Sequence, residues 1–268
     1  IFTGVISGYN FKCENSKYYY FGDDQEEKPF ILSGIYKYNN NNIYIGKLEC
    51  NFYDFCDFKN GLILDFKKLK KTFGIMYYFN GNKYIGEWLN NKKHGKGKMI
   101  YKNGDIYFGD WKNNFIDGIG RYVNKNKDIY YGEWKDNKKN GSGIMIFSIG
   151  EVYQGKWLNN KMNGKFKCKS KYDYYFYCEF INDKIEGNGT YIYSNGKIIN
   201  GTWQNNIKNG IFEHKLVNGD IHVFSYLKGK RFDKCIIYYK NGDIYEGEYD
   251  KFNIYLKHGI GDMFYNSN

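Results

Sequence analysis

Tyr84-Ile-Gly86-Glu-Trp88 is a five-residue stretch that returns, with variations, every 23 residues through most of this 268-residue chain. A fixed period in the twenties indicates stacked units that bury their apolar faces against one another. The fold therefore follows from the repeat rather than from chain length. The positions that keep the pattern are Tyr84, Gly86 and Trp88; Tyr107, Gly109 and Trp111; Gly132 and Trp134; Tyr153, Gly155 and Trp157; Gly201 and Trp203; and Tyr245 and Gly247.

The second half of each unit is equally regular. Trp88 is followed by a polar stretch at 89–94, then by Gly95-Lys-Gly97 and an apolar run that ends at Asn103-Gly104. Asn-Gly between apolar runs is typical of a type I′ hairpin turn, because both residues tolerate a positive φ. We therefore expect a tight turn at Asn-Gly and a wider six-residue turn at 89–94. Two short strands per unit, joined in this way, predict an all-β antiparallel meander.

Alternation along the strands predicts which side chains form the core. Tyr84, Gly86 and Trp88 share one face of the first strand, and Gly95 and Gly97 share the corresponding face of the second. A glycine inside an aromatic row weakens a strand unless a ring lies on its bare backbone. We therefore expect aromatic rings from neighbouring strands to pack directly on glycine.

These residues resemble the membrane occupation and recognition nexus (MORN) repeat family, whose units join a Tyr-x-Gly-x-Trp strand, a polar turn and a Gly-x-Gly strand. The resemblance covers 74–265 and implies an elongated, solenoid-like antiparallel meander of about eleven hairpins. Residues 1–73 would then form degenerate MORN-like hairpins, in one continuous ribbon with the regular repeats of 74–265. The spacing from Gly46 to Gly86 leaves room for one shortened unit at 60–68, with Phe66 in the glycine position.

Composition limits the compartment and the chemistry. The six cysteines are scattered without a Cys-x-x-Cys spacing, and Cys178 and Cys235 stand at glycine positions of the repeat. They are therefore interpreted as buried free thiols in a reducing, cytoplasmic compartment. No segment contains the roughly 18 apolar residues that a membrane-spanning helix needs.

A net charge of +11 favours an acidic partner. Part of this charge lies in the wide turns, which would align along one edge of the ribbon and suit an acidic protein or anionic lipid headgroups. The alternative is that turn tips simply carry solvated residues. Nucleic acid is disfavoured, because the aromatic residues belong to the repeat core and none is evidently free to stack on bases. The edge residues are Lys92, Lys93, Lys138, Lys139 and Lys161.

Two further segments have alternative interpretations. Between 166 and 235, bulky residues replace repeat glycines or tryptophans, which indicates either variation within a tolerant core or an apolar groove for a partner helix or a second copy. The groove residues would be Phe166, Phe180, Phe212, Phe224 and Tyr226. The basic stretch 62–73 is either an amphipathic membrane-surface helix or, as the register favours, one more degenerate strand.

No catalytic constellation emerges from the sequence. The four histidines accompany neither a metal-ligand spacing nor a nucleophile motif. We therefore expect a non-enzymatic scaffold without a cofactor, which binds protein partners and self-associates through its terminal strands. The resemblance to MORN proteins implies a membrane-associated cytoskeletal setting. The alternatives are the targeting arm of a lipid kinase or lysine methyltransferase, and a direct binder of anionic lipid.

Overall fold

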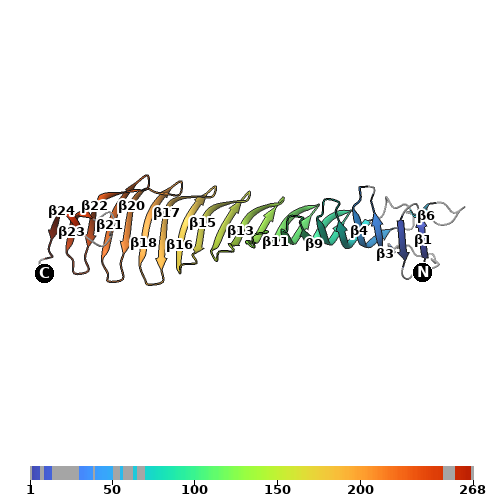
Figure 1. The fold of residues 1–268 in the computed structure, drawn as a ribbon, viewed down its shortest axis with the longest axis horizontal. Helices are drawn as coiled ribbons and strands as arrows, with labels where there is room; N and C mark the ends of the chain where they lie inside the picture. Colours follow the sequence, from blue (N-terminus) through green and yellow to red (C-terminus); the bar gives the residue numbers. More distant parts are fainter. Residues whose placement is uncertain are drawn as a thin grey trace, which may run out of the picture. The chain divides into compact units, whose positions relative to one another are not determined.

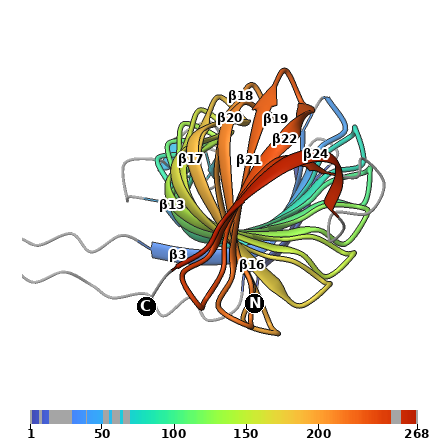
Figure 2. The same ribbon diagram turned by 90° about the vertical axis from the view of Figure 1, so that its left-hand side faces the viewer.

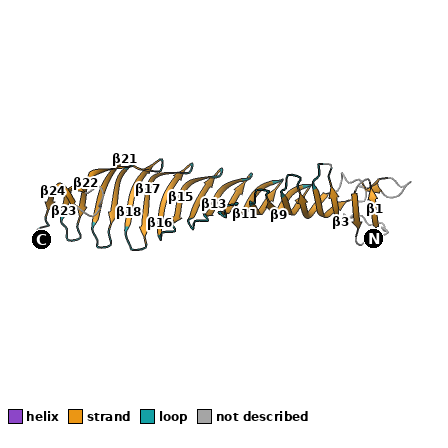
Figure 3. Ribbon diagram, viewed as in Figure 1, coloured by secondary structure: helices purple, strands orange, loops and turns teal. Residues whose placement is uncertain are grey.

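The computed structural model describes residues 2–6, 9–13, 30–38, 40–50, 55–56, 63–64, 70–249 and 257–266. The chain forms two compact units, Ile1–Asn137 and Lys138–Asn268. All regular structure in the described residues is strand, and no helix occurs among them (Figure 3). The boundary that the sequence suggests at residue 73 stays a prediction.

The first unit is an antiparallel meander in which each strand of the main sheet pairs with the next one along the chain (Figure 1). Two short pairs, β1–β2 and β5–β6, stand outside that series. The strands are β1 (Phe2–Ile6), β2 (Tyr9–Cys13), β3 (Phe30–Lys37), β4 (Ile43–Cys50), β5 (Phe55–Cys56), β6 (Ile63–Leu64), β7 (Lys70–Tyr77), β8 (Lys83–Leu89), β9 (Lys92–Ile100), β10 (Ile106–Lys112), β11 (Phe115–Val123) and β12 (Ile129–Lys135).

The second unit continues the same pattern, and its strands rotate progressively in the end-on view, as the twist of a β-sheet requires (Figure 2). Its strands are β13 (Lys138–Ile146), β14 (Val152–Leu158), β15 (Lys161–Lys169), β16 (Tyr174–Ile181), β17 (Lys184–Tyr193), β18 (Ile198–Gln204), β19 (Ile207–Lys208), β20 (Gly210–Lys215), β21 (Ile221–Leu227), β22 (Lys230–Tyr238), β23 (Ile244–Tyr249) and β24 (Lys257–Phe264). The prediction of an all-β antiparallel meander of hairpins is confirmed.

A line of directly paired glycines crosses the middle of the first unit. Gly86 in β8 pairs with Gly97 in β9, which pairs in turn with Gly109 in β10. The line continues from Gly109 through Gly120 to Gly132. Because none of these residues has a side chain, the line leaves a bare strip of backbone on which rings can lie.

The two kinds of turn are the reverse of what the sequence suggested. The turn after Trp88 is a two-residue turn in which Asn90 and Asn91 both have positive φ, 49° and 62°, as type I′ requires. At Asn103-Gly104 only the glycine has positive φ, 92°. Its N–H donates to the carbonyl oxygen of Tyr101 at 3.0 Å, so this loop is the wider one. Asparagine tolerates the left-handed region well enough to form the tight turn without glycine.

A second correction concerns Gly95, which does not share the aromatic face with Gly97. The register shifts between Gly86 and Trp88, where the single residue Glu87 of β8 stands against residues 94–96 of β9, so that β9 bulges. Gly95 has a φ of 60°, and a Cβ placed on it would collide with the carboxylate of Glu87. The bulge breaks the alternation of faces from which the prediction came.

The extra unit expected between Gly46 and Gly86 is absent from the main sheet. Gly46 in β4 pairs directly with Gly74 in β7, which pairs with Gly86. The intervening chain therefore adds no strand between β4 and β7. Of the stretch 62–73, Ile63–Leu64 and Lys70 onward are strands, whereas Phe66 and the remainder lie outside the described residues.

Candidate interaction surfaces

Each regular repeat is built around a tyrosine ring that lies on glycine. A Cβ on Gly97 would stand only 2.5 Å from Cε2 and Cζ of Tyr84, so no side chain fits beneath the ring. The Tyr84 hydroxyl donates to the carbonyl oxygen of Glu87 at 2.9 Å. Tyr107 repeats the arrangement, with its hydroxyl donating to Asp110 O at 3.0 Å. The predicted packing of rings on bare backbone is confirmed at these positions.

The tryptophans connect one repeat to the next. Tyr84 has its own Trp88 edge-on at 5.0 Å and Trp111 of the following repeat edge-on at 5.3 Å. The indole N–H of Trp111 also donates to the carbonyl oxygen of Gly97 at 3.1 Å. Edge-to-face pairs of this kind add to the apolar burial of the rings. The core is therefore a continuous series of rings within the unit.

The residues expected to form a groove are part of this core instead. Phe166, which occupies a glycine position, lies on Gly155 and packs 5.1 Å from Phe180. Its ring takes the place that a first-strand tyrosine has elsewhere, and Tyr153 is displaced so that its hydroxyl meets the Glu151 carboxylate at 3.3 Å. In the next repeat but one, Phe212 lies on Gly201 in the same way.

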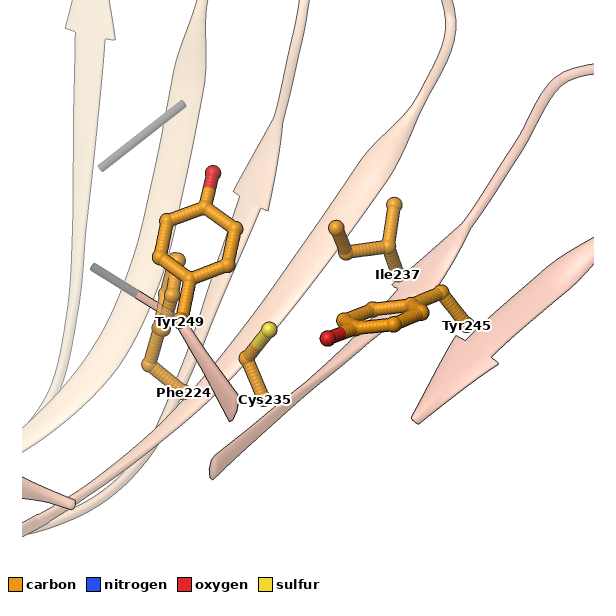
Figure 4. Packing of buried hydrophobic residues seen from close by; sticks show 5 residues of the cluster. All are labelled: Phe224, Cys235, Ile237, Tyr245 and Tyr249. Carbon is orange, nitrogen blue, oxygen red and sulfur yellow. The ribbon is translucent and has the colours of Figure 1, made fainter. Parts of the chain in front are cut away.

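The burial of these side chains excludes the predicted groove. Phe166, Phe180, Phe212 and Phe224 are 3%, 3%, 0% and 1% exposed. Tyr226 packs 4.8 Å from Phe212. A ring at a glycine position removes the neighbouring tyrosine ring and fills its space, so no apolar surface opens. Figure 4 shows the same packing near the C-terminal end, where Cys235 lies between the rings of Tyr245 and Tyr249.

The two-residue turns form an edge, here called the Asn-turn edge, that consists of these turns and their flanking residues. The second turn residue accepts a hydrogen bond from the preceding repeat: Asn91 Oδ1 from Lys71 N–H at 3.0 Å, and Asn114 Oδ1 from Lys93 N–H at 2.8 Å. The other two-residue turns are Asn113-Asn114, Asp136-Asn137, Asn159-Asn160, Asn182-Asp183, Asn205-Asn206 and Lys228-Gly229, the last of which has no side-chain acceptor at its second residue.

The lysines predicted for this edge divide into two groups. Lys92, Lys138 and Lys161 are exposed. Lys93 and Lys139 turn inward, with Nζ 4.1 Å from the Trp111 ring centroid and 4.9 Å from that of Trp157. The prediction that all five lysines have solvated ammonium groups is therefore wrong for Lys93 and Lys139. Consecutive side chains along a strand point to opposite faces.

Burial affects the protonation of the inward lysines. It lowers the pKa of Lys93 to about 8, and it does the same for Lys71, whose Nζ lies 5.2 Å from the rings of both Tyr38 and Trp88. These amines replace part of their hydration with contact to ring faces. They contribute to the core rather than to a binding edge.

Four exposed lysines of the Asn-turn edge have an aliphatic neighbour that the sequence reading overlooked. Leu158 lies directly across from Lys161, and Ile181 lies across from Lys184. The side chains of Leu158 and Ile181 are 48% and 51% exposed. Leu89 with Lys92 and Leu227 with Lys230 repeat the arrangement. Within each unit this edge consequently presents apolar and cationic groups side by side.

The sequence matches the MORN repeat family at 84–106, 107–129, 130–152, 153–165 and 179–198. The first two matches begin at Tyr84 and Tyr107, whose rings lie on glycine, and the first four follow the 23-residue period. The chain is a MORN-repeat protein. The assignment agrees with the observed geometry, because the residues that define a MORN unit are those of the ring-on-glycine core.

Solved structures similar to this MORN protein include the TCP10 domain of Danio rerio CPAP in complex with a peptide of Danio rerio STIL, with 11% identity, a TM-score of 0.47, and coverage of 67% of this chain and 82% of that one. Another is the Drosophila melanogaster SAS-4 (dCPAP) TCP domain with a proline-rich motif of Ana2, with 15% identity, a TM-score of 0.39, and coverage of 57% and 84%. At these TM-scores no argument rests on the likeness. No curated protein matches the sequence.

A buried histidine pair escaped the sequence reading. His214 in β20 lies directly across from His222 in β21, and both are 7% exposed. Burial, followed by the charges of Lys197 and Lys208, lowers the pKa of His214 to about 3. His222 Nδ1 lies 3.3 Å from the Tyr249 hydroxyl. The pair was detectable, because His222 stands at the tyrosine position of the 23-residue period.

The carboxylates of the MORN units accept hydrogen bonds from the backbone. Glu87 accepts the N–H of Lys96 at 3.0 Å, and Asp105 accepts that of Lys125 at 2.8 Å. Within the described ranges, no three His, Cys, Asp or Glu residues gather in a way that could hold a metal ion. The same part of the chain has no helix long and apolar enough to cross a membrane.

Not all aromatic residues belong to the core. Phe108 and Tyr131, which follow the buried Tyr107 and Tyr130 directly in sequence, are 58% and 54% exposed. The expectation that the repeat encloses its rings is therefore wrong at these positions. The residue after each repeat tyrosine faces outward by alternation.

Proposed function

We propose that this MORN-repeat protein is a non-enzymatic scaffold that binds other proteins, in the cytoplasm and at a membrane-associated cytoskeletal structure. The observation that carries the proposal is the Asn-turn edge, where half-exposed aliphatic side chains lie directly opposite exposed lysines in three hairpins of the second unit. Apolar groups beside cations suit a partner surface that combines apolar and acidic residues. The ring-on-glycine core supports this edge, because it holds each hairpin in a fixed position against the next.

The proposal is tested by reversing charges of the second unit on the Asn-turn edge and, as a control, beside the wider turns. Partners are first identified by cross-linking in native cells and then titrated as purified proteins. Lys161→Glu with Lys184→Glu should weaken binding by about tenfold or more. The control is Lys171→Glu with Lys240→Glu, at exposed lysines beside the wider turns, and it should bind like the unchanged protein. Equal effects of the two pairs would contradict this edge as the binding surface.

The scaffold role itself has a separate test. Enzymatic turnover by the full chain that is lost on a single substitution would refute a non-enzymatic protein. Whether the chain serves as the targeting arm of a lipid kinase or lysine methyltransferase is decided by the complete reading frame on both sides of it. The buried thiols of Cys168, Cys178 and Cys235 support a reducing compartment for the scaffold.

Direct binding of anionic lipid is a second candidate, favoured by the exposure of Lys92, Lys138 and Lys161. Sedimentation with acidic vesicles should then weaken steeply with salt and on reversal of these three charges. Reversal of the inward Lys93 and Lys139 is no test of the edge, because it would disturb the core. Binding that survives both salt and charge reversal would exclude the edge as the lipid reader.

A further inference from the structure

The outward face of the first unit carries a row of side chains that differs from the rest of the chain. It crosses the middle of four neighbouring strands and consists of Lys98 in β9, Phe108 in β10, Arg121 in β11 and Tyr131 in β12. Each member is the direct cross-strand partner of the next. This cation–ring row therefore alternates one positive charge with one aromatic ring.

The groups of the cation–ring row are free to bind. Phe108 and Tyr131 are more than half exposed, and within the described part of the chain neither ring has a ring or cation against its face. No carboxylate described by the structure lies within ion-pair distance of Lys98 or Arg121. The residues that the structure describes therefore leave both the ring faces and the charges of the row unpartnered.

The surroundings of the cation–ring row are asymmetric. On the side of the Asn-turn edge it is bordered by acidic residues, of which Asp110 is occupied by an ion pair with Lys96 and by the N–H of Ile119. On the other side the adjacent positions contain no carboxylate. They are Lys83, Ile100, Ile106, Val123 and Ile129. An anionic chain would be repelled on the first side and accepted on the second.

We propose that the cation–ring row binds single-stranded nucleic acid, a role beyond the scaffold function. Nucleic acid carries one phosphate and one planar base per nucleotide, and the row offers one cation and one ring per hairpin. Bases stack on Phe108 and Tyr131, while Lys98 and Arg121 contact phosphates. The two rings stand two strands apart, roughly 9.6 Å. Bases of a duplex are stacked about 3.4 Å apart on each other and cannot present their faces to these rings.

The twist of the sheet also favours a flexible ligand. The outward normal rotates by about 20–25° per strand, so a flat bilayer or a long rigid rod cannot contact the whole row. An acidic peptide can follow the twist and satisfy the two cations, but it brings no planar group for each ring. At the equivalent outward positions of the second unit one cation and one ring, Lys167 and Tyr177, are directly paired, but they are flanked by Gln154 and Thr190. Lys167 Nζ also lies 5.8 Å from the Tyr177 ring, so the second unit has one occupied pair rather than an alternating row.

Fluorescence anisotropy with a labelled 15-nucleotide oligo-dT, on the full chain at low salt, measures the binding. Phe108→Ala with Tyr131→Ala should weaken it by at least about 25-fold, since each stacking ring contributes roughly fivefold or more. Tyr172→Ala with Phe232→Ala removes two exposed rings of the second unit, 72% and 52% exposed, and should leave the affinity unchanged. Phe108→Leu with Tyr131→Leu keeps apolar bulk without a π face and should behave like the alanine pair.

The two cations give an independent readout. Lys98→Gln with Arg121→Gln should reduce the slope of log K against log salt by about 1.4, because two phosphate contacts are lost. Lys171→Gln with Lys240→Gln is the matched control. If both pairs of charge substitutions weaken binding equally and the ring substitutions have no effect, the attraction is unspecific and the proposal is overturned. Ring-dependent binding of a poly-glutamate–tyrosine peptide or of phosphatidylserine vesicles without binding of oligo-dT would also overturn it.

Discussion

The ring of Tyr84 in β8 lies on the bare backbone of Gly97 in β9, and its hydroxyl returns to its own strand to donate to Glu87 O at 2.9 Å. One residue thus covers the neighbouring strand and satisfies a carbonyl beside the bulge. Tyr245 in the second unit does the same, with Gly261 beneath the ring and a 2.8 Å bond to Glu248 O. This contact defines the repeat in both units.

Gly97→Ala should destabilise the first unit by about 1–3 kcal/mol, because the added methyl group would overlap the Tyr84 ring. Urea unfolding followed by tryptophan fluorescence measures the change. Lys96→Ala, at an exposed neighbour in the same strand, is the control and should shift the midpoint little. An unchanged midpoint for Gly97→Ala would show that the ring does not rest on this glycine.

Phe166 and Phe212, which both stand at glycine positions, should differ in their tolerance of truncation. Phe212→Gly should cost about 3–5 kcal/mol, because Ile199, at the tyrosine position, cannot fill the space. Phe166→Gly should cost at least about 1 kcal/mol less, since the displaced Tyr153 can return to the place that Tyr84 has in its repeat. Thermal unfolding of both variants makes the comparison. A larger loss for Phe166→Gly would contradict the exchange of rings.

Asn114 has a φ of 76° and accepts the N–H of Lys93 through its side chain. Asn114→Ala should destabilise by roughly 1–2 kcal/mol, because alanine resists the left-handed conformation and leaves that N–H without its acceptor. Asn114→Gly keeps the conformation and loses only the hydrogen bond. Its midpoint in urea should fall between those of the alanine variant and the unchanged chain, and any other order would refute this division.

Stability should rise with pH between about 7.5 and 9 because of the inward lysines. In the folded chain burial lowers the pKa of Lys71 and Lys93 to about 8, whereas the unfolded chain keeps ordinary lysines. Above pH 8 the unfolded chain binds more protons, so the free energy of unfolding increases with pH. Allowing for solvent screening, we expect roughly 1 kcal/mol per lysine over the window.

The tyrosines act in the opposite direction at higher pH. Burial raises their pKa values in the folded chain, to about 12 for Tyr78, so the unfolded chain loses tyrosine protons first, near pH 10, and stability falls there. Urea titrations at pH 7.5 and about 9, below that range, measure the rise. Lys93→Met should remove about half of it, and Lys92→Met, at an exposed lysine, should remove none. An equal pH dependence in the unchanged chain and in Lys93→Met would show that this amine remains charged in the folded chain.

Acid should destabilise the second unit through the histidine pair. The pKa of His214 is lowered to about 3 and that of His222 is also lowered, in both cases chiefly by burial. Below pH 6.5 these histidines bind protons in the unfolded chain but not in the folded chain. Stability therefore falls as the pH decreases toward 3. The loss should approach about 1 kcal/mol per pH unit for His214.

Thermal unfolding at pH 7 and pH 5 measures that loss. His214→Met introduces the residue found at the equivalent positions 99 and 145, and it should reduce the difference between the two melting temperatures. His258→Met, at an exposed histidine, should preserve it. If the difference is the same in all three chains, carboxylates rather than this pair cause the acid sensitivity.

Much of the fold was predictable from sequence because the same residue types recur at the same positions of each repeat. The 23-residue period, two strands per unit, and the need for glycine beneath Tyr84 all follow from alternation and from the missing side chain. The outward position of Phe108 and Tyr131 and the pairing of His214 with His222 also follow from the same counting, although the sequence reading did not extend it to them. Residues 14–29 and 51–54 lie outside what the structure describes, so their expected repeats stay predictions.

What the amino-acid sequence determined alone is the periodic assignment of side chains to the two faces of a meander, since a strand's period of two needs no tertiary information. Tertiary structure decided what that period cannot encode. The φ values of Asn90 and Asn91 made theirs the tight turn, and the bulge at Gly95 moved that glycine away from the aromatic face. Contacts between neighbouring strands placed Lys93 under a tryptophan, and they made Phe166 a substitute for a tyrosine ring rather than the wall of a groove. These outcomes depend on which group fills a shared space, and that is settled only when the strands are packed together.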